Sequence, residues 1–239
     1  MTDSEWSHIY THILQLEQDG LVTRTFRRLD PERQQAVITA ILDEAGEHGP
    51  TSINIKRVAE RAGVSIGSLY QYFNNREGLL AFTIELCVRL TTGVFNEYRP
   101  ILSAMSLRQA LTAYLMGGVE WGQTQMGLVQ FLARAAYHGD PQLGESVVRP
   151  IANIMRETVH DILTQAAARG EIRAGVDLEA ATRVVNTLMI AMGDAQLLPY
   201  LNTYLQVTDR KMPSERVLEA ALDMILQGIG IEARHPSHG

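Results

Sequence analysis

Residues 59–80 read AERAGVSIGSLYQYFNNREGLL, and this stretch decides between two folds. Gly63-Val64-Ser65-Ile66-Gly67 matches the G-x-S-x-G elbow that presents a nucleophilic serine in α/β-hydrolases. The same residues also fit a helix, a glycine turn and a second short helix, which is the helix-turn-helix arrangement of DNA-binding proteins. The elbow needs a buried strand before Ser65, whereas the second arrangement needs a helix there. The residues before Ser65 therefore decide which of the two folds the chain adopts.

The residues before the turn favour the helix-turn-helix. Residues 56–62, KRVAERA, form a polar amphipathic pattern and not a buried strand. Gly63 can take the left-handed conformation that ends a helix, and Ser65 can cap the next one. On that second helix Leu69 and Phe73 share the inward face. We expect a preceding helix, through Ile41, Leu42 and Ala45, to support it, because so short a helix is unstable alone.

The rest of the chain predicts an all-α protein, because apolar residues recur at intervals of three and four. An amphipathic helix is expected around Trp6–Ile13. Asp30-Pro31 supplies an N-cap and a first-turn proline for a helix that Gly46 and Gly49-Pro50 end. Asn75 caps a long helix that runs toward Tyr98 and that Pro100 closes. Further helices are expected near residues 106–124, 126–138, 141–169, 178–200 and 214–228.

Composition narrows the function classes. The chain has 239 residues, of which 46% are hydrophobic and 20% are charged, and no apolar run approaches the length of a membrane span. A single cysteine, Cys87, excludes an internal disulfide and fits a reducing cytoplasm. The net charge is −6, yet residues 50–76 contain four basic residues and one acidic residue, and residues 24–33 contain four and two. Positive charge thus gathers around the helix-turn-helix.

The pattern A-x-x-A-G-V-S-x-G-S-L-Y-x-Y-F-x-x-R-E-x-L-L, residues 59–80, resembles the DNA-binding domain of the TetR family of transcriptional regulators. The resemblance is strong over residues 31–80 and weaker near residues 170–177. It implies an all-α homodimer with an N-terminal three-helix DNA-binding domain and a C-terminal helical domain for ligand binding and dimerisation. The expected divisions are an extension (1–29), the helix-turn-helix (30–76), the effector-binding and dimerisation domain (77–230) and a tail (231–239).

By resemblance, the protein is expected to be a cytoplasmic repressor that binds a palindrome-like operator in double-stranded DNA and is released by a small, mostly apolar effector. No enzymatic activity, cofactor, metal or membrane partner is expected. The residues carried over as DNA contacts are Asn54, Lys56, Ser65, Ile66, Gly67, Ser68, Tyr70, Gln71, Tyr72 and Arg76. Gln71 can read adenine with two hydrogen bonds, and Ile66 can touch a thymine methyl group.

Two positions depart from the family pattern. Ile66 stands where lysine or another polar residue is common, which removes one polar contact. Arg76 replaces a usual lysine and keeps the positive charge for a DNA phosphate. For Tyr70 and Tyr72 core packing remains an alternative to DNA contact, and for Lys56, Arg57 and Arg61 a solvated helix face remains one.

The C-terminal half offers candidates for the effector cavity that the family implies. They are Trp121, Gln125, Phe131, Tyr137, Met155, His160, Met189 and Asp194, and ordinary core packing is the alternative for each. Two apolar stripes, on residues 181–192 and 217–226, suggest a dimer seam formed by the last two long helices. Packing within one chain is the alternative.

Other assignments stay open. Arg24, Arg27 and Arg28 can act as a basic arm along DNA, or they can be ordinary surface charge. His8 and His12 have metal-compatible spacing but lack the carboxylate of a zinc-peptidase motif. A helical interaction module without DNA binding and, less well supported, a helical enzyme are the alternatives to a regulator.

Overall fold

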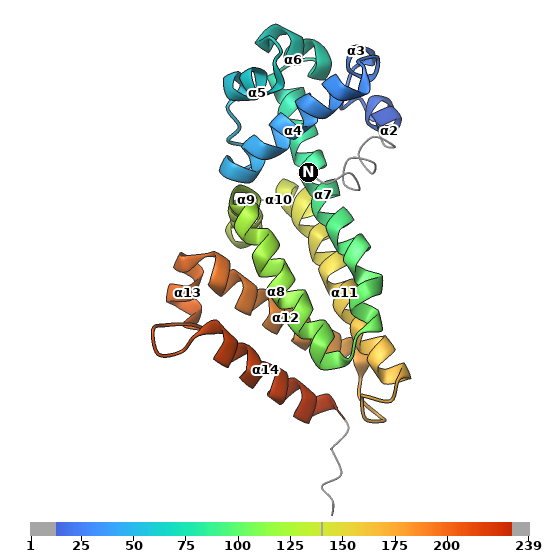
Figure 1. The fold of residues 1–239 in the computed structure, drawn as a ribbon, viewed down its shortest axis with the longest axis vertical. Helices are drawn as coiled ribbons and strands as arrows, with labels where there is room; N and C mark the ends of the chain where they lie inside the picture. The colour runs from blue at the N-terminus through green and yellow to red at the C-terminus, as the bar shows by residue number, and fades with distance from the viewer. Residues whose placement is uncertain (1–12, 140, 231–239) are drawn as a thin grey trace, which may run out of the picture. The chain divides into compact units, whose positions relative to one another are not determined.

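The computed structural model describes residues 13–139 and 141–230, and within these ranges it is built of helices with one isolated bridge, between Ile172 and Gly230 (Figure 1). The predicted all-α fold is confirmed. The contacts divide the chain into two compact units, residues 1–94 with 124–151, and residues 95–123 with 152–239. The expected helix around Trp6 and the tail after residue 230 lie outside the described residues.

The first unit holds the helix-turn-helix. Its helices are α2 (Ile13–Gln18), α3 (Arg24–Arg27), α4 (Pro31–His48), α5 (Ile55–Ala62), α6 (Ile66–Phe73), the first part of α7 (Arg76–Ala104), α9 (Met126–His138), α10 (Pro141–Leu143) and the π-helical η1 (Gly144–Val148). Asp30 caps α4 by accepting the Arg33 N–H at 2.9 Å, and Pro31 occupies the first turn, as expected.

An aromatic cluster forms the centre of the first unit near α6. Phe26, Phe73 and Phe82 are fully buried, and their ring centroids lie 5.4 Å (Phe26–Phe73) and 4.7 Å (Phe73–Phe82) apart. Ile38 and Ile41 of α4 are also fully buried. The core is thus assembled from α3, α4, α6 and α7, and α6 gains from its neighbours the stability that its length cannot supply.

α4 and α9 approach closely through glycines. A Cβ on Gly127 would lie 2.5 Å from the Gly49 nitrogen and 2.6 Å from the carbonyl oxygens of Ala45 and Gly46. The expectation that Gly46 ends its helix is wrong, because α4 continues to His48 with Gly46 buried inside it. Gly49 ends the helix with a φ of 87°. Gly46 allows Gln125 to pack closely against α4, and Gly49 ends the helix.

α7 continues past Pro100, which corrects the predicted end of this helix. Proline lacks the N–H that would bond to the carbonyl of Asn96, but contacts on both sides of it hold the helix together. Arg99 donates to Asp161 (Nε–Oδ2, 2.5 Å) and to Glu157 (Nη1–Oε2, 3.0 Å), and Leu102 is buried. Tertiary contacts here outweigh the loss of one backbone hydrogen bond.

α7 also corrects the expectation that no apolar segment approaches the length of a membrane span. An 18-residue window of this helix has a mean hydropathy of 1.5, so by length and composition α7 is able to cross a membrane. In the fold it is a core helix: Leu79, Phe82 and Leu86 are buried in the first unit. Arg89, in the middle of α7, pairs with Glu85 at 2.6 Å.

The second unit contains the end of α7, α8 (Leu107–Thr124), most of α11 (Arg149–Ala168), α12 (Leu178–Leu197), α13 (Pro199–Leu205) and α14 (Ser214–Ile229). The helix predicted over residues 178–200 ends at Leu197. Leu198, at φ −124° and ψ 92°, has the extended conformation that residues before proline favour, and Pro199 begins α13. The helix predicted over residues 141–169 is interrupted by the π-helical turn η1.

A single hydrophobic cluster joins the helices of the second unit. Its fully buried members include Leu111, Ile162 and Leu222, from α8, α11 and α14. α12 and α14 lie side by side in Figure 1 and contact each other. This arrangement leaves the outer faces of α12 and α14 without a neighbour in the described part of the chain.

Candidate nucleic-acid interface

Local caps shape the turn between α5 and α6. The Asn54 side chain accepts the N–H groups of Lys56 (3.1 Å) and Arg57 (3.3 Å) at the start of α5. Gly63 ends α5 with a φ of 65°, and the Ser65 Oγ accepts the Ser68 N–H at 3.0 Å at the start of α6. The predicted roles of Gly63 and Ser65 are confirmed. Ser65 follows a helix, so the structure lacks the strand that a nucleophile elbow requires there.

α6 has a buried and an exposed face. Leu69 and Phe73 are fully buried, as predicted from their spacing. The opposite face carries Ile66, which is 41% exposed, together with exposed Gly67 and Gln71. A Cβ on Gly67 would meet only the Ser65 Oγ, at 3.6 Å, so this face of the helix lies open. Ile66, Gly67 and Gln71 are therefore accessible on one face of α6.

The two tyrosines of α6 differ. Tyr70 is half-buried, but Tyr72 is only 7% exposed and packs 5.8 Å, between ring centroids, from Phe26. Core packing, the alternative for these residues, is therefore the main role of the Tyr72 ring. Ser68 is half-buried, and its hydroxyl lies 2.9 Å from that of Ser65, so the two hydroxyls share a hydrogen bond at the start of α6.

Two of the expected contacts lie at the start of α5. Asn54 is exposed, but its side-chain oxygen is already engaged in capping the helix, and its N–H donates to Glu44 at 3.0 Å. Lys56 is 76% exposed and forms only a long ion pair with Glu60, at 3.8 Å. The Lys56 ammonium thus remains available for a phosphate, whereas Asn54 acts first as a helix cap.

Arg76 begins α7 directly after α6. The Asn75 side chain accepts the Gly78 N–H at 2.8 Å and so caps this helix, as predicted. Arg76 is exposed, and no ion pair forms between it and the described residues.

Arg57 and Arg61 have a different role from a solvated helix face. Glu44 of α4 has a fully buried side chain, and the Arg57 Nε donates to both of its oxygens at 3.0 Å. Arg61 lies 3.6 Å from Glu44 and 3.0 Å from Glu47. Burial raises the pKa of the Glu44 carboxyl, but hydrogen bonds from Arg57 and Asn54 outweigh it, and the net pKa is lowered. This cluster ties α5 to α4.

Sequence reasoning missed Glu44. The available signal was helical spacing: of the two adjacent carboxylates Asp43 and Glu44, Glu44 lies three residues after Ile41 and next to Ala45, on the inward side of a helix that precedes two arginines. A charge in such a place needs a partner. The distance of 13 residues to Arg57 hides the pair from any local pattern.

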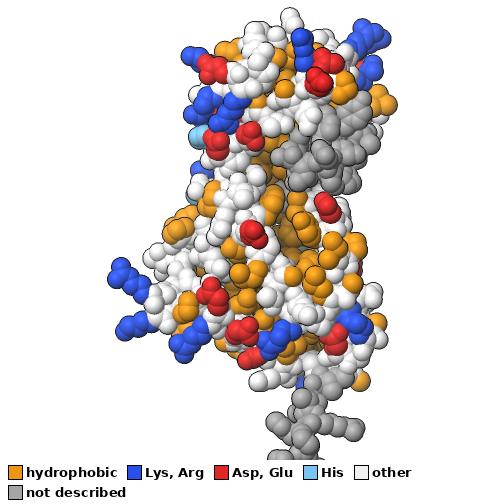
Figure 2. All heavy atoms as spheres, viewed as in Figure 1, with side chains coloured by type: hydrophobic (Ala, Val, Ile, Leu, Met, Phe, Trp, Pro, Cys, Tyr) orange, Lys and Arg blue, Asp and Glu red, His pale blue; other side chains and the backbone are white. Residues whose placement is uncertain are grey.

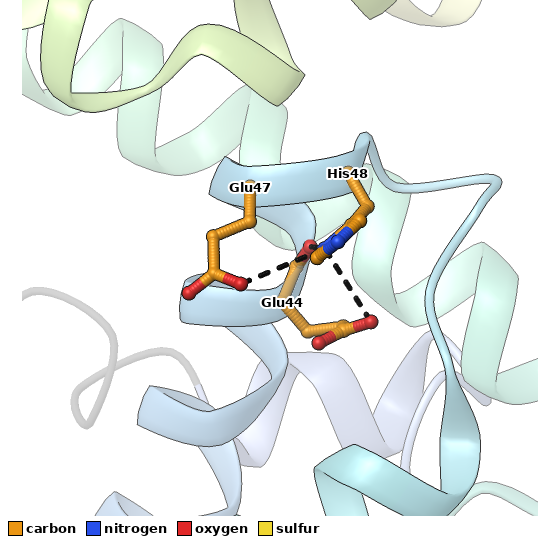
Figure 3. A group of neighbouring side chains, drawn as sticks. All are labelled: Glu44, Glu47 and His48. Atoms are coloured by element: carbon orange, nitrogen blue, oxygen red, sulfur yellow. Dashed lines mark hydrogen bonds and ion pairs between the residues drawn. The ribbon is translucent and has the colours of Figure 1, made fainter.

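Glu44, Glu47 and His48 also form the one group in the described part of the chain with metal-compatible spacing (Figure 3). The His48 Nδ1 lies 3.5 Å from Glu44 and 3.7 Å from Glu47. However, the guanidinium of Arg57 covers Glu44 and lies 3.2 Å from the His48 Nε2. Because a cation would face these positive groups, the cluster is built as an ion-pair network and not as a metal centre.

The eight residues proposed to line an effector cavity fall in both units. Trp121, Met155, His160, Met189 and Asp194 belong to the second unit, and Gln125, Phe131 and Tyr137 to the first. Phe131 is buried, and its Cβ lies 3.6 Å from the position of a Cβ on Gly49, so it packs against the end of α4. Tyr137 is 58% exposed and Met189 is 2% exposed. Their assignment to one cavity stays a prediction.

Comparison with known proteins agrees with this geometry. The family model described as "Bacterial regulatory proteins, tetR family" matches residues 37–81, which include α5 and α6. A second model, "Tetracyclin repressor-like, C-terminal domain", matches residues 104–193.

Individual relatives are more distant. The chain is 30% identical over 95 residues to the HTH-type transcriptional regulator BetI of Yersinia pestis (strain Pestoides F), which is 40% of this chain and 48% of that protein. The chain thus spans about half the length of this curated relative. It is 25% identical over 173 residues to the "Probable acrEF/envCD operon repressor" of Escherichia coli (strain K12), covering 64% of this chain and 70% of that one.

A solved structure shares the fold. A TetR transcriptional regulator from Chloroflexus aurantiacus J-10-FL superposes with a TM-score of 0.60 at 19% identity, covering 87% of this chain and 100% of that one. The two family models cover both the helix-turn-helix and the helices that follow it, and the relatives are regulators of transcription. The chain belongs to the TetR family of transcriptional regulators.

Proposed function

We propose that this regulator is a cytoplasmic repressor that binds a palindrome-like DNA operator as a homodimer and is released by a small, mostly apolar effector. The observation that carries the DNA-binding part is the open face of α6, with exposed Gln71 and Ile66, beside the unpaired Arg76. A helix of this kind enters the major groove with its exposed side chains against the base edges.

The exposed residues divide into two roles. Gln71 can form two hydrogen bonds with adenine, and Ile66 can contact a thymine methyl group, so these two residues would read sequence. Arg76 and Lys56 carry free or weakly paired positive charge and would bind phosphates, which position the protein without reading bases. Ser65, Gly67, Ser68 and Tyr70 complete the proposed contact face, and Gly67 lets the helix backbone come close to the DNA.

The outer faces of α12 and α14 support a dimer. Val184 is 61% exposed and Leu188 is 37% exposed, and these residues lie one helical turn apart on α12. Met224 of α14 is 72% exposed. Exposed apolar side chains on neighbouring helices favour a symmetric four-helix seam. The proposed seam differs from the predicted stripes, because Val185 and Leu222 are buried in their own chain's core and the exposed Met224 was not among the predicted residues.

Two buried polar atoms in the second unit support an effector with polar groups. The Tyr114 hydroxyl and the Asn186 side-chain oxygen lack a hydrogen-bond partner among the described residues. Tyr114 lies in the hydrophobic cluster, and burial raises its pKa. Since an unpaired buried polar group costs free energy, a ligand that supplies a partner for it gains affinity. The proposed ligand is therefore apolar with one or two hydrogen-bonding groups.

The test is selection of operators from fragments of the source genome, followed by binding measurements at several salt concentrations. The expected result is tight binding to a sequence with twofold symmetry and weaker binding to unrelated DNA. An interaction module or an enzyme would show no sequence preference, and that result would exclude the repressor. Addition of a screened apolar effector is expected to reduce operator affinity, because only a ligand that prefers one state shifts the equilibrium.

A further inference from the structure

The segment before the helix-turn-helix is docked on the C-terminal end of α6. The Thr23 N–H donates to the Tyr72 carbonyl at 2.8 Å, and the Thr23 hydroxyl donates to the Gln71 carbonyl at 2.8 Å. The last carbonyls of a helix have no partner within the helix. Thr23 therefore supplies partners from outside and fixes the segment to the helix that carries Gln71.

α3, which follows Thr23, is anchored as well. Phe26 is fully buried, and its ring centroid lies 5.4 Å from that of Phe73 and 6.3 Å from that of Phe82. The Gln34 side chain of α4 donates to the carbonyls of Phe26 (3.1 Å) and Arg27 (3.0 Å). These contacts hold α3 in one position relative to α6, so its exposed side chains have defined places beside the proposed DNA contacts.

Some arginines between residues 13 and 76 form ion pairs with carboxylates, and others do not. Arg27 pairs with Glu17 and Arg33 lies 3.5 Å from Asp30. Arg57 and Arg61 pair with the carboxylates of α4. Among the arginines between residues 13 and 76, the three that form no ion pair with described residues are Arg24, Arg28 and Arg76.

Arg24 and Arg28 share a surface. They are four residues apart on α3 and the turn that ends it, both are exposed, and side chains at this spacing lie on one face. In Figure 2, Lys and Arg side chains stand at the edge of the surface where α3 lies. A pair of unpaired guanidinium groups on a rigid support is suited to anionic oxygens, which they bind with two parallel hydrogen bonds.

We propose that Arg24 and Arg28 bind DNA phosphates next to the base pairs that α6 reads, so that residues 23–28 are a folded part of the DNA-binding surface. The proposal rests on the proposed DNA-binding function. It assigns the segment a positioning role, because phosphates carry no sequence information. Its rigid attachment through Thr23 and Phe26 means that these contacts add affinity without the cost of ordering a flexible arm.

The experiment compares the full-length protein with Arg24→Ala/Arg28→Ala on the selected operator. The slope of log Kd against log salt concentration should fall by about 0.9 for each phosphate that the variant no longer neutralises, with two such phosphates per protomer. With the wild type, ethylation of the phosphates next to those that Arg76 contacts should interfere with binding. With the variant, this interference should disappear. The matched control is Arg210→Ala/Lys211→Ala, which removes the same charge from exposed residues of the second unit.

The outcomes separate the two proposals. If wild type selects an operator but Arg24→Ala/Arg28→Ala keeps the wild-type salt slope and interference pattern, the phosphate contacts are refuted and the repressor stands. If the control pair lowers the slope equally, the effect is one of net charge, and the contacts are again refuted. If wild type shows no sequence preference, the repressor fails and this inference fails with it. Unchanged melting temperatures are expected for both variants, because all four side chains are exposed.

Discussion

Replacement of Gly127 by alanine tests the contact between α4 and α9. In an open helical position this change would stabilise the protein by up to about 1 kcal/mol, because glycine is the poorer helix former. Here the new Cβ would lie 2.5 Å from the Gly49 nitrogen and 2.6 Å from the carbonyl oxygens of Ala45 and Gly46. All three are backbone atoms, and none can rotate out of the way.

The magnitude follows from the geometry. To restore ordinary contact distances, α9 has to move away from α4 by roughly 1 Å, since non-bonded heavy atoms attract best near 3.5–4.0 Å. Overpacking of this kind costs about 1–3 kcal/mol, which exceeds the helix-propensity gain. We therefore expect Gly127→Ala to lower the free energy of unfolding by roughly 1–2 kcal/mol.

Two further glycines provide graded controls. A Cβ on Gly46 would lie 2.6 Å from the Gln125 Oε1, the end of a flexible side chain that can move, so Gly46→Ala should be nearly neutral. Gly117, inside α8 and exposed, has nothing within 4 Å, and Gly117→Ala should stabilise by about 0.5–1 kcal/mol. Urea unfolding at one fixed protein concentration measures all three. Equal stabilisation by Gly127→Ala and Gly117→Ala would refute the close approach of α4 and α9.

Four other substitutions test the site and the assembly. Gln71→Ala should cost about 1–3 kcal/mol at its target base pair and relax base preference, whereas Arg76→Ala should weaken all sequences alike and lower the salt slope; equal effects on specificity would contradict these roles. Glu44→Gln should lower stability by about 2 kcal/mol at pH 7. In the folded protein the pKa of Glu44 is lowered from 4.5, so the ionised carboxylate stabilises the fold above pH 4.5, and this stabilisation is lost as pH falls through the folded pKa. The free energies of unfolding of wild type and variant, measured at decreasing pH, should therefore become equal in acid. Met224→Lys should produce a monomer in sedimentation experiments and weaken operator binding, whereas the same change at Tyr204, which is 83% exposed on α13, should leave the dimer intact.

The sequence determined the parts of this protein that depend on neighbouring residues. Asn54, Ser65 and Asn75 cap their helices through N–H groups two or three residues away, and Gly63 reverses the chain by its own conformational freedom. The inward positions of Leu69 and Phe73 follow from helical periodicity. Such interactions are local, so the sequence of one chain is enough to predict them.

Tertiary structure decided which side chains near the helix-turn-helix are engaged by other residues of the chain and which remain exposed for a partner. The sequence left Tyr72 with two roles, DNA contact and core packing, and the structure packs its ring against Phe26, which comes from outside the helix-turn-helix. Arg57 and Arg24 are both arginines near the helix-turn-helix, yet Arg57 is bound to Glu44, whereas Arg24 forms no ion pair within residues 13–139 and 141–230. These outcomes depend on groups that are far apart in the chain and meet only when the helices pack, because partners for burial and charge are chosen in space.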